Sequence, residues 1–284
     1  MRSLSENRPL KPLGFASLKG LRRLCLVTAY DFPSAFLAER VGIDAILVGD
    51  SAAMVLLGYK DTIPITIDEM LIFSKAVTRA ATNTLVIADM PFLSYQSSSE
   101  SAIVNAGRFL KESGVGAIKI EGGTEYAPLV KKMVESGIPV MGHIGLLPQS
   151  AALSRGFNKQ GKTVNDAEKI FRDAEALEKA GAFSIVMEMV PREVSRLVTE
   201  HVKIPTIGIG SGPKCDGQIL VWHDLLGLGE KQMRFVKRYV NLRDQIVNAL
   251  TNYKDEVKEG EFPADKNSFN MNNAEFKKFM KRIS

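Results

Sequence analysis

Ionisable residues recur in this sequence where short apolar runs stop. The runs end in LVGDS, VIADMP, AIKIEGG, VMGHIG and IVMEMV, and they follow one another at helix-length intervals. If the runs are parallel strands, these side chains gather at the strands' carboxyl ends, which form the active-site rim of a β/α barrel. The residues concerned are Asp50, Asp89, Lys119, Glu121, His143 and Glu188.

Three of these residues are carboxylates on successive runs: Asp50, Asp89 and Glu121. A single one would be explained by a helix cap or a salt bridge to lysine, because an uncompensated buried charge is costly. Three together favour a divalent cation, and Mg²⁺ commonly takes one or two carboxylates and leaves its other positions to water and substrate. With only three histidines and two cysteines in the chain, such a metal must be held mainly by oxygen.

Lys119 lies two residues before Glu121, so both side chains point to the same side of a strand, toward the barrel interior. A lysine in the apolar run AIKIE is unexpected for packing alone. It could neutralise Glu121, bind an anionic group of a substrate, or form a Schiff base. A metal-dependent enolisation needs no imine, and the adjacent carboxylates favour the metal route.

Glu188 ends the run SIVMEMV between two methionines, an environment that raises a carboxyl pKa toward neutrality and makes a usable base. The structural alternative is a glutamate that faces outward at the strand end.

His143 is equally compatible with catalysis and with a structural hydrogen bond. The segment IGIGSG, residues 207–212, is explained by a tight turn, and we assign it no phosphate site; Cys215 beside it is interpreted as a small buried apolar residue.

Eight short apolar runs alternate with amphipathic stretches and predict an α/β fold, a (β/α)8 TIM barrel with helical extensions at both ends. Continuous apolar runs are typical of parallel strands that are buried on both faces. An open doubly wound sheet would usually need a Gly-rich dinucleotide turn near its start, and the sequence has none there. The predicted strands are Leu24–Ala29, Ala45–Gly49, Leu85–Asp89, Ala117–Glu121, Pro139–Gly142, Ser184–Glu188, Thr206–Ile209 and Ile219–Trp222.

The pattern divides the chain into three regions. Residues 1–23 form a basic N-terminal extension, residues 24–253 the barrel with a closing helix over Lys231–Tyr253, and residues 254–284 a polar C-terminal tail. Among the helices between the strands, one is predicted from Ser98 to Gly114 and another over Asp166–Lys179.

The formal charge of +5 arises entirely in residues 1–23, which hold six basic side chains and one acidic one. The rest of the chain is neutral, which argues against a nucleic-acid partner.

We interpret residues 1–23, the basic leader, as a flexible N-terminus rather than an organelle presequence, because this segment has little amphipathic character. No apolar run is long enough for a membrane span, and Cys25 and Cys215 are interpreted as reduced thiols, so we expect a soluble cytoplasmic protein without a membrane partner.

Taken as a set, the strings of this chain closely resemble the ketopantoate hydroxymethyltransferase family (3-methyl-2-oxobutanoate hydroxymethyltransferases) over roughly residues 15–265. They are TAYD (28–31), VGDS (48–51), a G-Y-x-x-T-x-P-I-T segment (58–66), ADMPF (88–92), KIEGG (119–123), GHIGLLPQS (142–150), MEMVP (187–191), IGIGSG (207–212) and CDGQILV (215–221). The chain departs from the family pattern at Ala52 and Ala53, where Leu-Gly is usual.

The resemblance implies a barrel that transfers a one-carbon unit from 5,10-methylenetetrahydrofolate to 3-methyl-2-oxobutanoate and gives 2-dehydropantoate, for pantothenate and coenzyme A synthesis. It also implies a large homo-oligomer, commonly a decamer. The implied roles are as follows: Asp50 and Asp89 resemble Mg²⁺ ligands, Glu121 the third acidic member of that site, Ser51 and Lys119 the groups that hold the oxoacid carboxylate, Glu188 the base, and His143 a residue near the new hydroxymethyl group.

Two other functions compete with this one. The first is a Mg²⁺-dependent lyase or mutase of the phosphoenolpyruvate mutase and isocitrate lyase type, which usually places a Cys- or Asn-containing gating loop after the fourth strand. Here KIEGG runs directly into a helix. The second is a non-enzymatic binding barrel, which would have no reason to keep three acids, a lysine and Glu188 on one rim.

Overall fold

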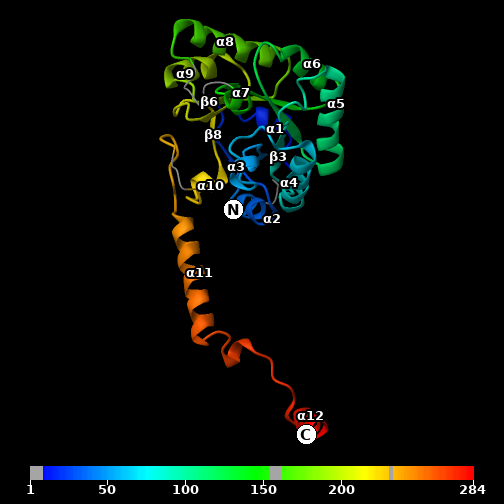
Figure 1. The fold of residues 1–284 in the computed structure, drawn as a ribbon. Helices are drawn as coiled ribbons and strands as arrows, with labels where there is room; N and C mark the ends of the chain where they lie inside the picture. Colours follow the sequence, from blue (N-terminus) through cyan, green and yellow to red (C-terminus); the bar gives the residue numbers. More distant parts are fainter. Residues whose placement is uncertain (1–8, 154–160, 230–232) are drawn as a thin grey trace.

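A closed barrel of parallel strands forms the body of the protein (Figure 1). The computed structural model describes residues 9–153, 161–229 and 233–284. The strands pair in chain order, and β1 pairs with β8 to close the barrel, which confirms the predicted fold. Their bounds are β1 (Leu24–Thr28), β2 (Ala45–Val48), β3 (Leu85–Asp89), β4 (Ala117–Glu121), β5 (Val140–Gly145), β6 (Ser184–Glu188), β7 (Thr206–Ile209) and β8 (Gly217–Leu220).

Helices surround the barrel and extend the chain beyond it (Figure 1). The predicted helix start at Ser98 and stop at Gly114 are confirmed, since the Ser98 hydroxyl caps α5 and Gly114 adopts a left-handed conformation. The helices are α1 (Pro12–Ala16), α2 (Phe32–Arg40), α3 (Ala52–Val55), α4 (Ile67–Ala80), α5 (Ser99–Arg108) with the π-helical turn η2 (Phe109–Ser113), α6 (Ala127–Glu135), α7 (Pro148–Leu153), α8 (Val164–Lys179), α9 (Arg192–His201), α10 (Trp222–Leu225), α11 (Leu242–Glu259), the 3-10 turn η3 (Asp265–Asn267) and α12 (Asn273–Ile283).

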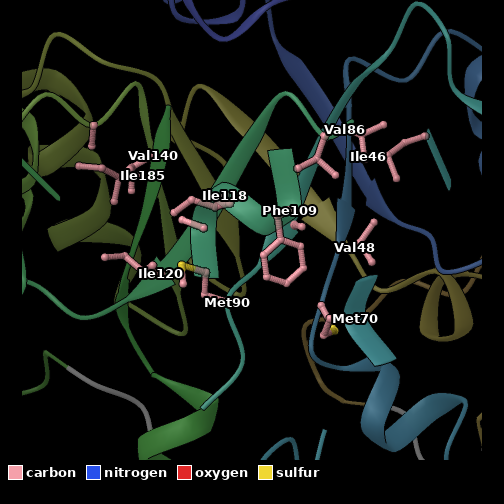
Figure 2. Close-up of a cluster of buried hydrophobic side chains, with 14 of the residues drawn as sticks. Ile46, Val48, Met70, Val86, Met90, Phe109, Ile118, Ile120, Val140 and Ile185 are labelled. Carbon is pink, nitrogen blue, oxygen red and sulfur yellow. The ribbon is translucent and has the colours of Figure 1, made fainter. Parts of the chain in front are cut away.

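Each strand divides its side chains between two apolar cores, because successive residues point to opposite faces. One core fills the barrel and includes Leu26, Leu47, Ile87, Met141, Val186 and Ile207. The other lies between the barrel and its helices. Figure 2 shows part of this cluster, with Phe109 and Met70 from the surrounding helical segments and the strand residues Ile46, Val48, Val86, Ile118, Ile120, Val140 and Ile185. The inward positions continue at the strand ends into ionisable residues, so strand periodicity alone directs these polar side chains into the mouth of the barrel.

The amino-terminal end of the barrel is closed by α1. Phe15 is fully buried and makes an edge-to-face contact with Phe183, with ring centroids 6.0 Å apart. Lys19 forms an ion pair with Asp216 at 2.6 Å, and Arg22 donates to Asp44 at 2.9 Å. From Pro12 onward the basic leader is therefore part of the folded barrel, and the expectation of flexibility was wrong for this part. Residues 1–8 lie outside the described range.

Strand β8 begins two residues before its predicted start and ends before Trp222, which starts α10 instead. Gly217 is the reason that the sequence pattern misses this strand, because glycine is unfavourable in strands by propensity. A Cβ at this position would lie 2.7 Å from the Cβ and from the carbonyl oxygen of Leu24. The close approach of β1 therefore requires a residue that strand prediction penalises.

Residues 231 and 232 of the helix predicted over Lys231–Tyr253 lie outside the described range; among the residues that follow them, the helix begins at Leu242 and continues to Glu259. The residues from 233 to 241 form turns and irregular backbone. In this segment, the Tyr239 amide donates to the carbonyl of Leu225 at 3.0 Å, and the Leu242 amide donates to Leu226 at 2.9 Å. These contacts with the end of α10 take the place of helical hydrogen bonds.

From α11 onward the chain extends away from the barrel (Figure 1). None of the residues of α11 or α12 is buried. The C-terminal region 254–284 is thus largely exposed. It differs from the predicted polar tail in that it contains the amphipathic helix α12, which carries apolar side chains along one side: Phe276, Phe279, Met280 and Ile283. Among the described residues, no helix has the length and apolar character needed to cross a membrane.

Candidate active site

The strand ends bring the predicted ionisable residues together at the carboxyl-terminal mouth of the barrel. In the register of the sheet, Asp89 pairs with Lys119 across β3 and β4, and Glu121 pairs with His143 across β4 and β5. Glu188 follows on β6, beside Gly145 of β5. These positions are adjacent because parallel strands of similar length end on the same side of the barrel.

Asp50 and Asp89 are linked to each other and to Lys119. The Lys119 Nζ lies 2.8 Å from Oδ1 of Asp89. The backbone amide of Asp50, in the turn after β2, donates to Oδ2 of Asp89 at 3.0 Å. All three side chains are buried. Lys119 is therefore paired with Asp89, rather than with Glu121 as the structural alternative supposed.

The cluster carries more negative than positive charge. Burial raises the pKa of Asp50 to about 7, and the nearby Asp89 carboxylate adds to the shift. Burial and then the charge of Asp50 also raise the pKa of Glu121 well above its usual range. Burial alone would lower the pKa of the Lys119 ammonium, but the carboxylates around it, Asp89 first, raise it. One ammonium thus faces three carboxylates, and a second positive charge would stabilise their ionised forms.

The donor set fits a divalent cation that is held by two carboxylates. Oε1 of Glu121 is buried and has no hydrogen-bond partner in the described part of the chain, so it retains capacity for a further contact. Within that same part, no three His, Cys, Asp or Glu side chains are arranged as a complete set of metal ligands. Two carboxylates, completed by water and substrate, are the arrangement typical of Mg²⁺.

His143 is a neutral imidazole that connects Lys119 with Glu188. Burial and then the Lys119 charge lower its pKa well below the usual value. Its Nδ1 lies 3.3 Å from the Lys119 Nζ, and its Nε2 lies 3.4 Å from Oε2 of Glu188. An ammonium only donates, so Nδ1 is the acceptor and the ring proton resides on Nε2, facing Glu188. The geometry thus selects one tautomer of His143.

Glu188 faces the mouth of the barrel as a carboxyl group of raised pKa. Burial raises its pKa to about 7, and the Lys119 charge opposes this shift. Its side chain keeps 16% of its surface exposed, so a small molecule in the mouth can reach it. The next residue, Met189, has a left-handed conformation with φ of 51°, which is uncommon for a side chain of this size. Glu188 is thus not the outward-facing glutamate of the structural alternative.

Ser51 lies at the first turn of α3 beside Tyr30. The Tyr30 hydroxyl is 2.8 Å from the Ser51 Oγ, and Tyr30 itself is buried. Burial raises the pKa of the Tyr30 phenol, which therefore stays protonated. Tyr30 was not predicted as a site residue, although it lies within the string TAYD, and a tyrosine just after the first strand was the available signal.

Two further residues of the cluster were missed. Gln149 at the start of α7 donates to Asp50 and to Glu121, and the Tyr95 hydroxyl contacts both Gln149 and the backbone of Glu121. Gln149 lies within the quoted string GHIGLLPQS. Both side chains are buried. Buried polar groups of this kind are normally hydrogen-bonded, and here their partners are the proposed metal ligands.

The glycine-rich segment after β7 is a structural turn, as expected. Gly210 and Gly212 have positive φ angles of 65° and 80°. The Ser211 hydroxyl is fully buried, donates to the carbonyl of Met187 at 2.7 Å and accepts from the Val190 amide at 3.1 Å. The segment therefore supports the end of β6.

Comparisons with known proteins agree with this architecture. Curated proteins named 3-methyl-2-oxobutanoate hydroxymethyltransferase match most of the chain. The protein from Moorella thermoacetica is 54% identical over 87% of this chain and 92% of its own length. The one from Thermotoga neapolitana is 57% identical over 89% and 93%, and the one from Nitrosopumilus maritimus is 50% identical over 93% and 95%.

Solved structures of low sequence identity share the fold. A phosphonopyruvate hydrolase in complex with oxalate and Mg²⁺ has a TM-score of 0.59 at 14% identity, with 96% of both chains covered. A phosphoenolpyruvate phosphomutase from Streptomyces platensis subsp. rosaceus has a TM-score of 0.56 at 16% identity, with 92% of both chains covered. At these identities the likeness concerns the barrel alone. Residues 14–265 match the family described as ketopantoate hydroxymethyltransferase, and the chain therefore belongs to this enzyme family.

Proposed function

We propose that this enzyme transfers a hydroxymethyl group from 5,10-methylenetetrahydrofolate to 3-methyl-2-oxobutanoate and gives 2-dehydropantoate, a step of pantothenate biosynthesis. The observation that carries the proposal is the buried cluster of Asp50, Asp89 and Lys119 beside the carboxyl group of Glu188. It combines sites for a cation and an anionic substrate with a base, which is the equipment that enolisation of a 2-oxoacid requires.

Asp50 and Asp89 would hold Mg²⁺, with Glu121 as the third acidic member of the site. Another divalent ion that prefers oxygen ligands fits the same donors. When bound, the ion would supply the positive charge that polarises the oxoacid carbonyl and stabilises negative charge on its oxygen. The raised pKa values of Asp50 and Glu121 support this assignment, because both reflect carboxylates that lack sufficient positive charge.

The other residues act on the oxoacid itself. Ser51 and Lys119 bind its carboxylate, the serine through its hydroxyl and the lysine through its buried ammonium. Glu188 removes the proton from C3, and the electron pair left on C3 forms the bond to the methylene carbon of the folate as one carbon–nitrogen bond of that carbon breaks. Water displaces the second folate nitrogen from this carbon, and tetrahydrofolate leaves with the protons given up by C3 and by water on its two nitrogens. His143 presents Nε2 to Glu188 across 3.4 Å and lies close to the new hydroxymethyl group. Water supplies the hydroxyl oxygen of the product.

The lyase or mutase alternative is less well supported by this chain. The connection from β4 to α6 is residues 122–126, which leaves no room for a long gating loop. In this short connection, the Gly122 amide donates to the carbonyl of His143 at 3.0 Å, and the Thr124 amide donates to Asp173 at 2.9 Å. The connection is therefore fixed at its first residue and at its middle.

Proton exchange at C3 tests the proposal. In D₂O with Mg²⁺, NMR should show loss of the C3 proton of 3-methyl-2-oxobutanoate with the wild type, and addition of the folate should give 2-dehydropantoate. Glu188→Gln should abolish both, because an amide cannot accept the proton. Glu200→Gln, on the exposed side of α9, is the matched control and should retain both activities.

Two outcomes would contradict the proposal at different levels. Exchange that persists unchanged in Glu188→Gln would remove this residue from the role of base. No exchange and no product from the wild type, with or without folate, would argue against the transferase itself. Cleavage of a C–C or P–C bond in a 2-oxoacid by the wild type would favour the lyase or mutase class.

A further inference from the structure

We infer that Gln149 is a positioning residue that orients Asp50 and Glu121 for the cation and makes cation affinity depend on how α7 is seated. The inference rests on the metal site of the proposed function and adds a residue to it. Gln149 is the second residue of α7, and 2% of its surface is exposed. It is far from Asp50 and Glu121 in sequence, yet it contacts both.

The side-chain amide of Gln149 is fully engaged on its donor side. Nε2 donates to Oδ2 of Asp50 and to the carbonyl oxygen of Met90, in each case at 3.0 Å. Met90 directly follows Asp89, so one amide group connects the ends of β2 and β3. These two strands carry the proposed cation ligands.

The backbone of Gln149 holds the third carboxylate. Its amide donates to Oε2 of Glu121 at 3.1 Å. The other oxygen of that carboxylate, Oε1, is buried without a hydrogen bond among the described residues. Gln149 thus binds one oxygen of Asp50 and one of Glu121, and the orientation of each carboxylate, including where its second oxygen points, is set by α7.

The orientation of the amide is itself determined by its surroundings. Oε1 of Gln149 lies 3.1 Å from the Tyr95 hydroxyl and 3.4 Å from Nε2 of Gln96, both of which donate to it. A flipped amide would place Oε1 against a carboxylate and a carbonyl, where only repulsion results. Glutamine meets these demands because it combines two donors with an acceptor; leucine fills a similar volume with neither.

This arrangement couples the cation to α7 in both directions. If a seated α7 orients the ligands and thereby favours cation binding, the bound cation must favour the seated α7 by the same factor. Residues that orient metal ligands commonly contribute about tenfold to a hundredfold to metal affinity. We expect Gln149 to contribute within that range, since it touches two carboxylates rather than one.

Calorimetric titration of the full-length enzyme with MgCl₂ tests the inference without recourse to activity. Gln149→Leu should weaken Mg²⁺ binding by about tenfold or more, whereas Gln218→Leu should leave it unchanged. Gln218 is the matched control because it is an exposed glutamine whose Nε2 donates to a backbone carbonyl, that of Gly212, and to no carboxylate among the described residues. If Gln149→Leu does not fold, Tyr95→Phe removes one hydroxyl that fixes the amide and should weaken binding by a few-fold.

Hydrogen exchange provides a second readout. Mg²⁺ should slow exchange of the amides in a peptide spanning 146–151 in the wild type, and this protection should be lost in Gln149→Leu. The catalytic defect of the variant should also diminish at high Mg²⁺, which a merely structural defect would not do. Equal Mg²⁺ affinity of Gln149→Leu and wild type would overturn the inference and leave the proposed function intact. A wild type that binds no divalent ion would instead contradict the proposed metal site.

Discussion

At the scale of single residues, the site consists of charged groups whose burial works against their ionisation. Asp50 and Glu188 are both carboxyl groups with pKa values raised to about 7, and burial is the first cause for each. They differ in what surrounds them. Asp50 has the carboxylate of Asp89 beside it, which suits a cation, whereas Glu188 has the neutral His143 at 3.4 Å and the Lys119 charge acting on it, which suits a base.

The raised pKa of Glu188 predicts how activity depends on pH. A base must be ionised, so kcat/KM should fall about tenfold for each pH unit below about 7 and reach a plateau above it. Glu188→Gln should lower the plateau by about 10²-fold to 10⁴-fold and remove this limb of the profile. Measurement of kcat/KM from pH 5 to 9 checks this, with Glu200→Gln as the control. A wild-type profile that is flat across pH 7 would exclude Glu188 as the titrating base.

The raised pKa of Glu188 also predicts how the stability of the fold depends on pH, in the direction opposite to that of activity. The folded-state pKa of Glu188 is above its unfolded value, so its protonated form stabilises the fold below about pH 4.5, and this contribution is lost as pH rises through about 7. Between pH 4.5 and 8, Glu188→Gln should therefore gain stability relative to the wild type, by at most about 3 kcal/mol. Urea unfolding of both proteins at the two pH values measures the difference. A difference independent of pH would contradict the assigned shift.

The sequence identified the charged part of the site and missed its neutral part. Asp89, Lys119 and Glu188 are conspicuous because an ionisable residue interrupts or ends an apolar strand. Gln149 and Tyr95 are not, because an amide or a phenol in a loop or at a helix start is ordinary. Their role arises from contacts with strands that are distant in sequence, which the local pattern does not contain.

At the scale of elements, the sequence predicted the bounds of strands correctly where apolar runs are continuous. The prediction failed where the strand requires glycine. β3, β4, β6 and β7 have their predicted bounds. The predicted bounds of β8 were shifted toward the C-terminus because glycine at position 217 indicates the end of a strand by propensity. The close contact with Leu24 nevertheless requires glycine there. The prediction for α11 began the helix too early, because the apolar spacing of the helix continues into the residues before it. Backbone amides of this segment instead donate to carbonyls at the end of α10.

Gly145, at the end of β5, is the glycine of the active-site rim that we expect to be required for both stability and activity. Its φ is +93°, and a Cβ there would lie 2.4 Å from the carbonyl oxygen of Glu188. Gly145→Ala should therefore displace Glu188 as well as strain the backbone, with a loss of more than about 2 kcal/mol and a large fall in activity. Gly137→Ala is the matched control, since its φ is +82° but, among the described residues other than its chain neighbours, no heavy atom lies within 4 Å of the added Cβ.

The two variants separate backbone strain from displacement of the base. Gly137→Ala should cost about 1 to 2 kcal/mol through its φ alone and leave kcat/KM unchanged. Chemical unfolding and steady-state kinetics of both variants provide the measurement. Equal kinetics in Gly145→Ala and the wild type would show that the contact with Glu188 does not position the base.

At the scale of the whole molecule, the two ends of the barrel have separate tasks. The amino-terminal end is closed by α1 with Phe15, while the carboxyl-terminal end holds the ionisable cluster. This division is general for such barrels, where one face supports stability and the other activity. The part of the molecule that neither task explains is the C-terminal region, which extends from the barrel with no buried side chain in α11.

The exposed apolar side of α11 predicts self-association. Ile246, Leu250, Tyr253 and Val257 are spaced as one side of a helix, and between 42% and 61% of each residue's surface is exposed. An isolated helix of this length is only marginally stable in water, so we expect a second copy of the chain to cover this side and form a homo-oligomer. Leu250→Asp should reduce the molar mass measured by light scattering and lower the far-UV helical signal. Asn248→Asp, on the opposite side of α11, should leave both unchanged, and a monomeric wild type would contradict the expectation.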